Sequence, residues 1–198
     1  IWKRPAGLPP WRPETGTAVS PGPGAPAGRS VDPIARITEA GKTDPRLGQL
    51  ATGFLARLEK DAEARYRTAL ESLDRSYVAN GLARARASAQ ASGSLEQVTA
   101  IDAEKARTES GEPMPEMDEP ALAESVKALR STYREALGKL ELDRASRAGP
   151  VYDLYLGALD TYVAELTQAN EIERARAVKS LRDEVASLKP SATGPVTP

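Results

Sequence analysis

The sequence predicts an all-α protein in which two antiparallel helical hairpins form an elongated, coiled-coil-like bundle. Apolar residues recur at steps of three and four along several stretches, which is the spacing of a one-sided helix. Gly93 and Asn170 each separate two such stretches, and both residue types tolerate the left-handed backbone that ends a helix. The apolar fraction of 40%, carried mainly by Ala, Leu and Val, and the aromatic fraction of 5% suit thin helix-on-helix packing.

These patterns divide the chain into five segments. We expect a Pro/Gly-rich linker over residues 1–45, a first helical hairpin over 46–110, an acidic Pro-rich link over 111–119, a second hairpin over 120–189 and a disordered tail over 190–198. The first 33 residues have the composition of a disordered, partly polyproline-like chain, with too little apolar content to bury.

The chain's two tryptophans, Trp2 and Trp11, both lie in this Pro-rich segment. Three interpretations stay open: chance remnants, an interfacial membrane edge formed by Trp2 with the neighbouring Lys3 and Arg4, or anchors that bind a partner. The chain begins at Ile1 rather than Met, which leaves room for a signal peptide or an anchor before it.

The end of the linker and the start of the first hairpin carry local signals for helix ends. Ile34 and Ile37 predict a short helix that Gly41 ends, and Thr43 or Asp44 then caps a helix whose first residue is Pro45. That helix is expected to reach about residue 91, as one helix or two in line. Its apolar stripe advances in steps of four between residues 50 and 70, which indicates a straighter or slightly right-handed packing in place of a left-handed supercoil. Asn80-Gly81 predicts a kink, and a further helix fades by residue 110.

The link contains four acids whose spacing differs from that of a calcium loop. Glu112, Glu116, Asp118 and Glu119 lack the alternating ligands and central Gly of an EF-hand. A solvated linker without a metal site is therefore the favoured interpretation.

The second hairpin carries the clearest heptad pattern. Its first helix opens at Pro120 and is expected to end before Gly149-Pro150, where Pro150 starts a new helix that runs to the Asn170 turn. The last apolar stripe continues until Pro190.

Composition excludes several functional classes. The chain has no Cys and no His, so thiol nucleophiles, zinc–thiolate sites and imidazole catalysis are absent. The net charge of −1 argues against a nucleic-acid binder, and no run of about eighteen apolar residues is present to span a membrane. No Gly-rich phosphate loop appears, so no cofactor or small-molecule substrate is expected.

Two turn regions are similar in sequence, which predicts an internal duplication. The run ASGSLEQVTAI (91–101) aligns with QANEIERARAV (168–178), with Gly93 opposite Asn170. Together with the Tyr-x-x-x-Leu pattern at Tyr133 and Tyr155, these runs resemble duplicated helical-hairpin domains of uncharacterised exported bacterial proteins, over roughly residues 50–188. The resemblance implies an exported, periplasmic or envelope location and carries over no catalytic residue.

The favoured function is a non-enzymatic structural or interaction module that binds another protein or itself, because one-sided helices bury little area alone. An accessory subunit of a membrane-bound complex, tethered by a segment before Ile1, is the alternative. An enzyme is disfavoured because acids pair with bases at helical spacing, as Glu171 does with Arg174. Candidate partner-binding residues, which ordinary packing also explains, are Tyr133, Tyr152, Tyr155, Tyr162, Trp2 and Trp11.

Overall fold

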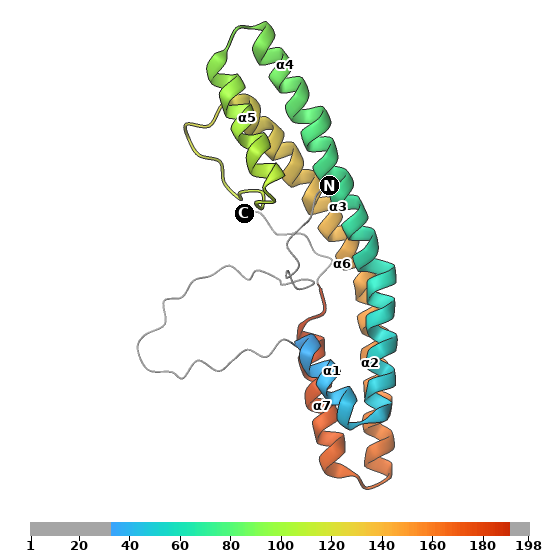
Figure 1. Cartoon of the computed structure of the whole chain (residues 1–198). Coiled ribbons are helices and arrows are strands. Elements are labelled where there is room, and N and C mark those ends of the chain that lie inside the picture. Colours follow the sequence, from blue (N-terminus) through green and yellow to red (C-terminus); the bar gives the residue numbers. More distant parts are fainter. Residues whose placement is uncertain (1–32, 191–198) are drawn as a thin grey trace, which may run out of the picture. The chain divides into compact units, whose positions relative to one another are not determined.

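The computed structural model describes residues 33–190 and confirms the all-α class, since helices and no strands are found among them. Trp2 and Trp11 lie outside the described residues. The helical segments are α1 (Pro33–Thr43), α2 (Pro45–Leu58), the π-helix η1 (Glu59–Glu63), α3 (Ala64–Ser76), the π-helix η2 (Tyr77–Leu82), α4 (Ala83–Ala91), α5 (Leu95–Glu109), α6 (Glu124–Gln168) and α7 (Ile172–Ser187). Figure 1 labels these α-helices along the chain. None of the described helices combines the length and apolar character needed to cross a lipid bilayer.

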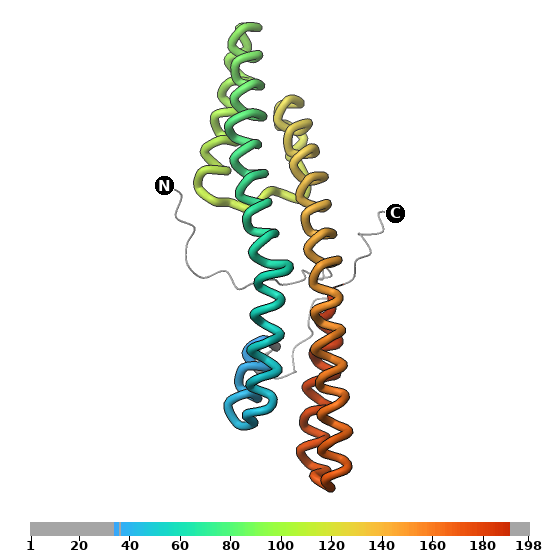
Figure 2. The backbone as a smooth tube through the Cα atoms, turned by 90° about the vertical axis from the view of Figure 1, so that its right-hand side faces the viewer, coloured from blue at the N-terminus to red at the C-terminus, as the bar shows by residue number. Residues whose placement is uncertain are grey.

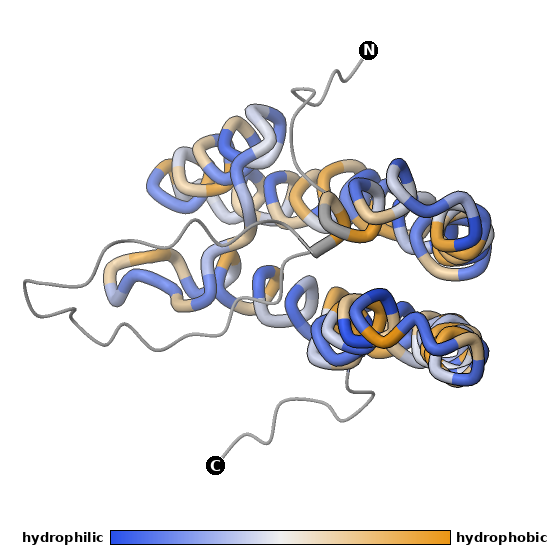
Figure 3. Tube along the Cα trace, turned by 90° about the horizontal axis from the view of Figure 1, so that it is seen from below, coloured by the Kyte–Doolittle hydropathy of each residue, from blue (hydrophilic) through white to orange (hydrophobic). Residues whose placement is uncertain are grey.

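The described residues form two compact units, of which unit 1 holds residues 33–57 and 151–189. Helix α1 packs against α7, and α2 packs against the C-terminal part of α6 through Phe54. The Phe54 ring meets Tyr152 edge-on, with 5.1 Å between centroids, and stacks on Tyr155 at 4.5 Å. Figure 3 shows hydrophobic and hydrophilic residues alternating along the helices.

The close packing of α1 against α2 depends on two glycines. Only Asp44 separates the two helices, so their backbones meet almost at once. A Cβ atom at Gly48 would stand 2.7 Å from the carbonyl oxygen of Gly41, and one at Gly41 would stand 2.8 Å from the Cα atom of Gly48. Side chains at these two positions are therefore incompatible with the observed helix crossing.

Asp44 joins three helices of unit 1. Its Oδ1 atom accepts hydrogen bonds from the backbone N–H groups of Arg46 and Leu47 (2.9 and 3.3 Å), so Asp44 caps α2 as the sequence predicts. Its Oδ2 atom accepts hydrogen bonds from the Tyr162 hydroxyl of α6 at 2.7 Å and from Arg174 of α7 at 2.8 Å. Partial burial alone would raise the pKa of Asp44, but these hydrogen bonds outweigh it and lower that pKa below its ordinary value.

Unit 2 holds residues 58–150, in which α3, η2 and α4 continue one after another and α5 folds back against α4. The N-terminal part of α6 completes the unit, and Figure 2 shows α6 as one continuous tube. Its core cluster consists of Tyr77, Leu82, Ala89, Ile101, Val126 and Tyr133. Arg144 of α6 also binds the buried Glu63 through two hydrogen bonds of 2.7 and 2.9 Å.

Helix α6 begins at Glu124, four residues after the start predicted at Pro120, and two predicted helix ends inside helices are wrong. Helix α6 runs through Pro150, where the sequence predicts a break, and the buried Val151 and Tyr152 directly after it keep the chain packed. Proline lacks the N–H that would bond to residue 146, so this helix forgoes one hydrogen bond for continuous packing. Gly41 does not end α1 either, because the helix continues to Thr43 and Gly41 serves the contact with Gly48.

Three helices end in the same hydrogen-bonded turn. Gly93, Asn170 and Gly111 have φ angles of +69°, +61° and +82°. In each turn this residue donates to the carbonyl three positions back, and the next residue donates to the carbonyl five positions back, as in a Schellman motif. The predicted ends at Gly93 and Asn170 are thus present, whereas the duplication of the flanking helices stays a prediction.

Among the described residues, Asn170 is the non-glycine residue with this left-handed backbone. Substitutions at Asn170 therefore test the turn directly. We expect Asn170→Ala to destabilise unit 1 by about 1 kcal/mol, because a Cβ without a local polar partner disfavours positive φ. Asn170→Gly should match or exceed the stability of the parent chain. Hydrogen exchange of the α7 amides would measure both changes, and equal stability of the two variants would contradict this account.

Candidate functional site

An apolar groove of about 510 Å³ lies on unit 2 between α6 and the run from α3 to α4. Its first wall extends from Leu73 to Ala85 and its second from Ser125 to Ala136. At a rise of about 1.5 Å per residue, these walls are about 17 Å long, or roughly three helical turns. The groove is lined by Leu73, Ser76, Tyr77, Asn80, Gly81, Arg84, Ala85, Ser125, Ala128, Leu129, Thr132, Tyr133 and Ala136.

The floor of the groove is fixed by contacts between facing helices. The Tyr77 and Tyr133 rings meet edge-on with 5.0 Å between centroids, and a Cβ at Gly81 would stand 3.3 Å from the Leu129 side chain. The π-helix η2 supplies Tyr77, Asn80 and Gly81 to one wall. Asn80-Gly81 therefore lies within a π-helical turn that shapes the groove, and the helical run continues through it.

Arg84 is the cation that lines the groove. Among the described residues its guanidinium makes no hydrogen bond or ion pair, whereas Arg86, two positions along, binds Asp102 at 2.7 Å. Ser125 also lines the groove, and its hydroxyl is buried without a hydrogen-bond partner in the described part of the chain.

Behind the floor lies a buried charge network centred on Glu104, whose side chain is 1% exposed. Its carboxylate accepts hydrogen bonds from the Tyr77 hydroxyl at 2.9 Å, from Arg107 at 2.7 and 3.0 Å, and from Arg130 at 2.5 Å. Arg130 also donates to Asp118 at 3.3 Å, so the network reaches from α5 across α6 to the segment between these helices. Both charges of the central pair are thus compensated, as burial requires.

The arginines of this network hold the connecting segment, residues 110–123, against the helices. Arg107 donates to the carbonyls of Glu112 and Pro113 at 3.1 and 2.8 Å, and Arg134 donates to that of Pro115 at 3.1 Å. Arg134 also forms a two-pronged pair with Asp118 at 2.6 and 3.0 Å. The interpretation of this link as solvated is therefore wrong at Asp118, whose side chain is 14% exposed.

The network moves the pKa values of its titratable groups away from neutrality. Burial by itself would raise the pKa of Glu104, but the hydrogen bonds from Arg107, Arg130 and Tyr77 prevail and lower that pKa to about 2. The hydrogen bond from Arg134 chiefly lowers the pKa of Asp118. Burial, then the bond to Glu104, raises the pKa of Tyr77 above its ordinary value.

The four tyrosines selected from the sequence lie in internal packing. Tyr152, Tyr155 and Tyr162 of unit 1 are 3%, 4% and 6% exposed, and burial raises the pKa of Tyr155 to about 12. Tyr133 of unit 2 is 8% exposed, donates to Asp74 at 2.5 Å and is the member of this set that lines the groove. Their arrangement agrees with the packing interpretation, and partner binding by these residues and by Trp2 and Trp11 stays a prediction.

The groove itself has no signal in the sequence, because its walls come from segments about fifty residues apart. The sequence likewise gives no sign that Glu104 is buried and paired. Its partners Arg130 and Tyr77 lie about 26 residues away in either direction along the chain. The described residues contain no group of three or more His, Cys, Asp or Glu side chains arranged to hold a metal ion.

Comparisons of the chain with protein-family models, with curated protein sequences and with solved structures find no match. The resemblance to duplicated helical-hairpin domains thus stays a prediction, and a functional proposal depends on the groove and the network.

Proposed function

We propose that the protein is a non-enzymatic helical interaction module whose groove on unit 2 binds a segment of another protein. The observation that carries this proposal is an open, predominantly apolar groove three helical turns long, walled by two antiparallel helices. A third helix laid between two such helices packs its side-chain ridges into the surface between them. Small residues such as Ala85, Ala128 and Ala136 leave space for a close approach.

The acid–base chemistry of the network supports a role in binding rather than in catalysis. A general acid or base works best with a pKa near the working pH. Glu104 and Asp118 have pKa values displaced in the opposite direction, because arginines hold both carboxylates in the charged state. Their contribution is therefore to fix the connecting segment and the groove floor in one arrangement.

The finer architecture and the location belong to the same proposal. We propose that two antiparallel helical hairpins form a coiled-coil-like bundle, which the equivalent hydrogen bonds of the turns at Gly93 and Asn170 support. An exported or envelope location is supported by the absence of cysteine, which avoids mispaired thiols outside the cell. Fractionation of the producing cell would test this location directly.

Photo-crosslinking in the producing cell tests the interaction. Ala128 and Ser146 are both small, exposed residues on the unit 2 part of α6, but Ala128 alone lines the groove. With p-benzoylphenylalanine replacing Ala128, we expect one dominant adduct with another protein, identified by mass spectrometry. The same photoreactive residue in place of Ser146 should give no such adduct. No adduct from position 128, or the same adducts from both positions, would refute the proposed function.

A further inference from the structure

We propose that the groove selects an amphipathic helix whose apolar stripe ends in a carboxylate, and that Arg84 binds this carboxylate. The inference rests on the proposed function and specifies the chemistry of the partner. It combines the length of the groove, the position of its cation and the polar groups at the same end.

The contacts across the groove fix where Arg84 lies along it. Tyr77 faces Tyr133 and Gly81 faces Leu129, which is an antiparallel register advancing by four residues on each wall. One further turn in the same register places residues 84 and 85 opposite Ser125. Arg84, whose guanidinium has no partner among the described residues, and Ser125 therefore lie at one end of the groove.

This end of the groove favours a negative charge. Helix α6 begins at Glu124, so the positive end of its dipole adjoins Ser125, although Glu124 itself pairs with Lys127 at 2.8 Å. A carboxylate in this place would accept hydrogen bonds from the Arg84 guanidinium. Three turns of helix would then lay apolar side chains at positions i, i+4 and i+7 along the remaining, apolar part of the groove.

A helix fits the groove better than the other common forms of peptide. An added strand needs an open sheet edge, and the described residues contain no sheet. A polyproline segment docks on exposed aromatic ridges, but the Tyr77 and Tyr133 rings belong to residues only 6% and 8% exposed. The chain's own Pro-rich segment carries Lys3, Arg4 and Arg12 around its tryptophans, which would bring like charges towards Arg84.

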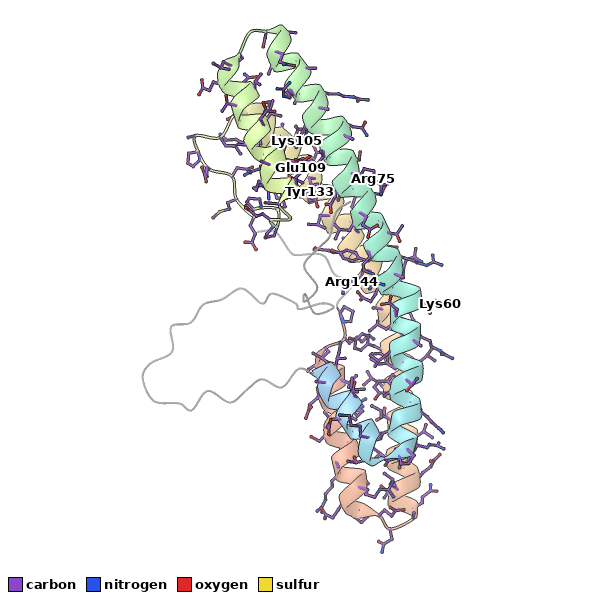
Figure 4. All side chains as sticks on the ribbon, viewed as in Figure 1. Lys60, Arg75, Lys105, Glu109, Tyr133 and Arg144 are labelled. Atoms are coloured by element: carbon purple, nitrogen blue, oxygen red, sulfur yellow. The ribbon has the colours of Figure 1, made fainter. Side chains whose placement is uncertain are left out.

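The test uses a displayed library of twelve-residue helices with a fixed leucine stripe and with Glu, Gln or Lys allowed at the positions flanking each end. The full chain serves as bait in four forms: parent, Arg84→Gln, Arg84→Glu and Arg75→Gln. Arg75 is the matched control, because it is an exposed arginine of α3 whose side chain points away from α6 in Figure 4.

We expect the parent and Arg75→Gln to enrich Glu over Lys at one end of the helix by about tenfold, the effect of a charge-assisted hydrogen bond at a partly exposed site. Arg84→Gln should remove this preference, and Arg84→Glu should reverse it towards Lys. Methyl NMR of the complex with the best helix should show shifts at Leu73 and Leu129 that Ala128→Gln abolishes and Ser146→Gln retains.

Three results would overturn the inference. They are the absence of any selected helix, a charge preference that does not depend on residue 84, and methyl shifts confined to other surfaces. Concentration-dependent dimerisation that Ala128→Gln abolishes would also overturn it, since a second copy would then be the occupant. If position 128 still crosslinks to another protein while Arg84→Glu leaves the charge preference unchanged, Arg84 does not bind the carboxylate and the proposed function stands.

Discussion

Gly48→Ala should destabilise unit 1 by about 2 kcal/mol, the usual cost of overpacking a closely fitted contact. The added Cβ would stand 2.7 Å from the Gly41 carbonyl oxygen, which belongs to the backbone and has no rotamer to escape into. Helices α1 and α2 would have to separate, and the Asp44 carboxylate that caps α2 would lose its alignment with Tyr162 and Arg174. Hydrogen exchange of the α1 and α2 amides would measure the loss.

The matched control is Gly53→Ala, further along α2. No atom lies within 4 Å of a Cβ built at Gly53, so the substitution meets no obstacle. Alanine restricts the unfolded chain and favours helix, so this variant should gain about 1 kcal/mol in the same measurement. Shifts of the same sign for Gly48→Ala and Gly53→Ala would show that the close contact does not limit the packing of these helices.

The helix ends that could be predicted depend on local chemistry. Asp44 before Pro45 supplies a side-chain acceptor and a residue without an N–H, and both act within one helical turn. Gly93 and Asn170 tolerate positive φ, which is likewise a property of the residue itself. Such signals need no knowledge of distant parts of the chain, and each of these helix ends is present in the structure.

The π-helices were not predicted, although the sequence contained a signal for one of them. Phe54, Leu58 and Ala62 follow each other in steps of four, and all three are buried. Four residues of an α-helix exceed a full turn by about 40°, so a stripe with this period would drift around the helix. A π-turn accommodates more residues per turn and returns the stripe to the buried side. The segment η1 lies at Glu59–Glu63, within this stripe.

The helix ends predicted at Gly41 and before Pro150 are wrong for another reason. In both places tertiary packing outweighed the local preference of the residue to end a helix. Pro150 weakens α6 at one hydrogen bond, but Ala148, Val151 and Tyr152 around it are all buried in the continuing helix. The buried charge network could not be predicted from the sequence, because its pairs form only through the tertiary packing of the helices. Glu104 and Asp118 look like ordinary surface acids until Arg130, Arg134 and Tyr77 are brought to them from other helices.

Glu104→Gln should destabilise unit 2 by about 3 kcal/mol at neutral pH, since it leaves the buried Arg130 and the partly buried Arg107 without their central countercharge. The matched control is Asp102→Asn on the same helix, which removes an exposed ion pair with Arg86 and should change stability little. Hydrogen exchange of the α5 amides and of the connecting segment would locate the loss, because Arg107 and Arg130 hold both. Equal effects of the two substitutions would contradict the central role of the Glu104 network.

The pH dependence distinguishes the lost charge from a simple packing defect. The folded state lowers the pKa of Glu104 from its ordinary value of 4.5 to about 2, so between these values the unfolded chain binds the proton first. The stability that this carboxylate supplies is complete above about pH 4.5 and is lost as the pH falls through about 2. Glu104→Gln cannot titrate at this position, so urea denaturation should show its stability deficit relative to the parent chain shrinking across that window. A deficit equally large at about pH 2.5 and about pH 6 would assign the effect to altered packing and remove the charge from the explanation.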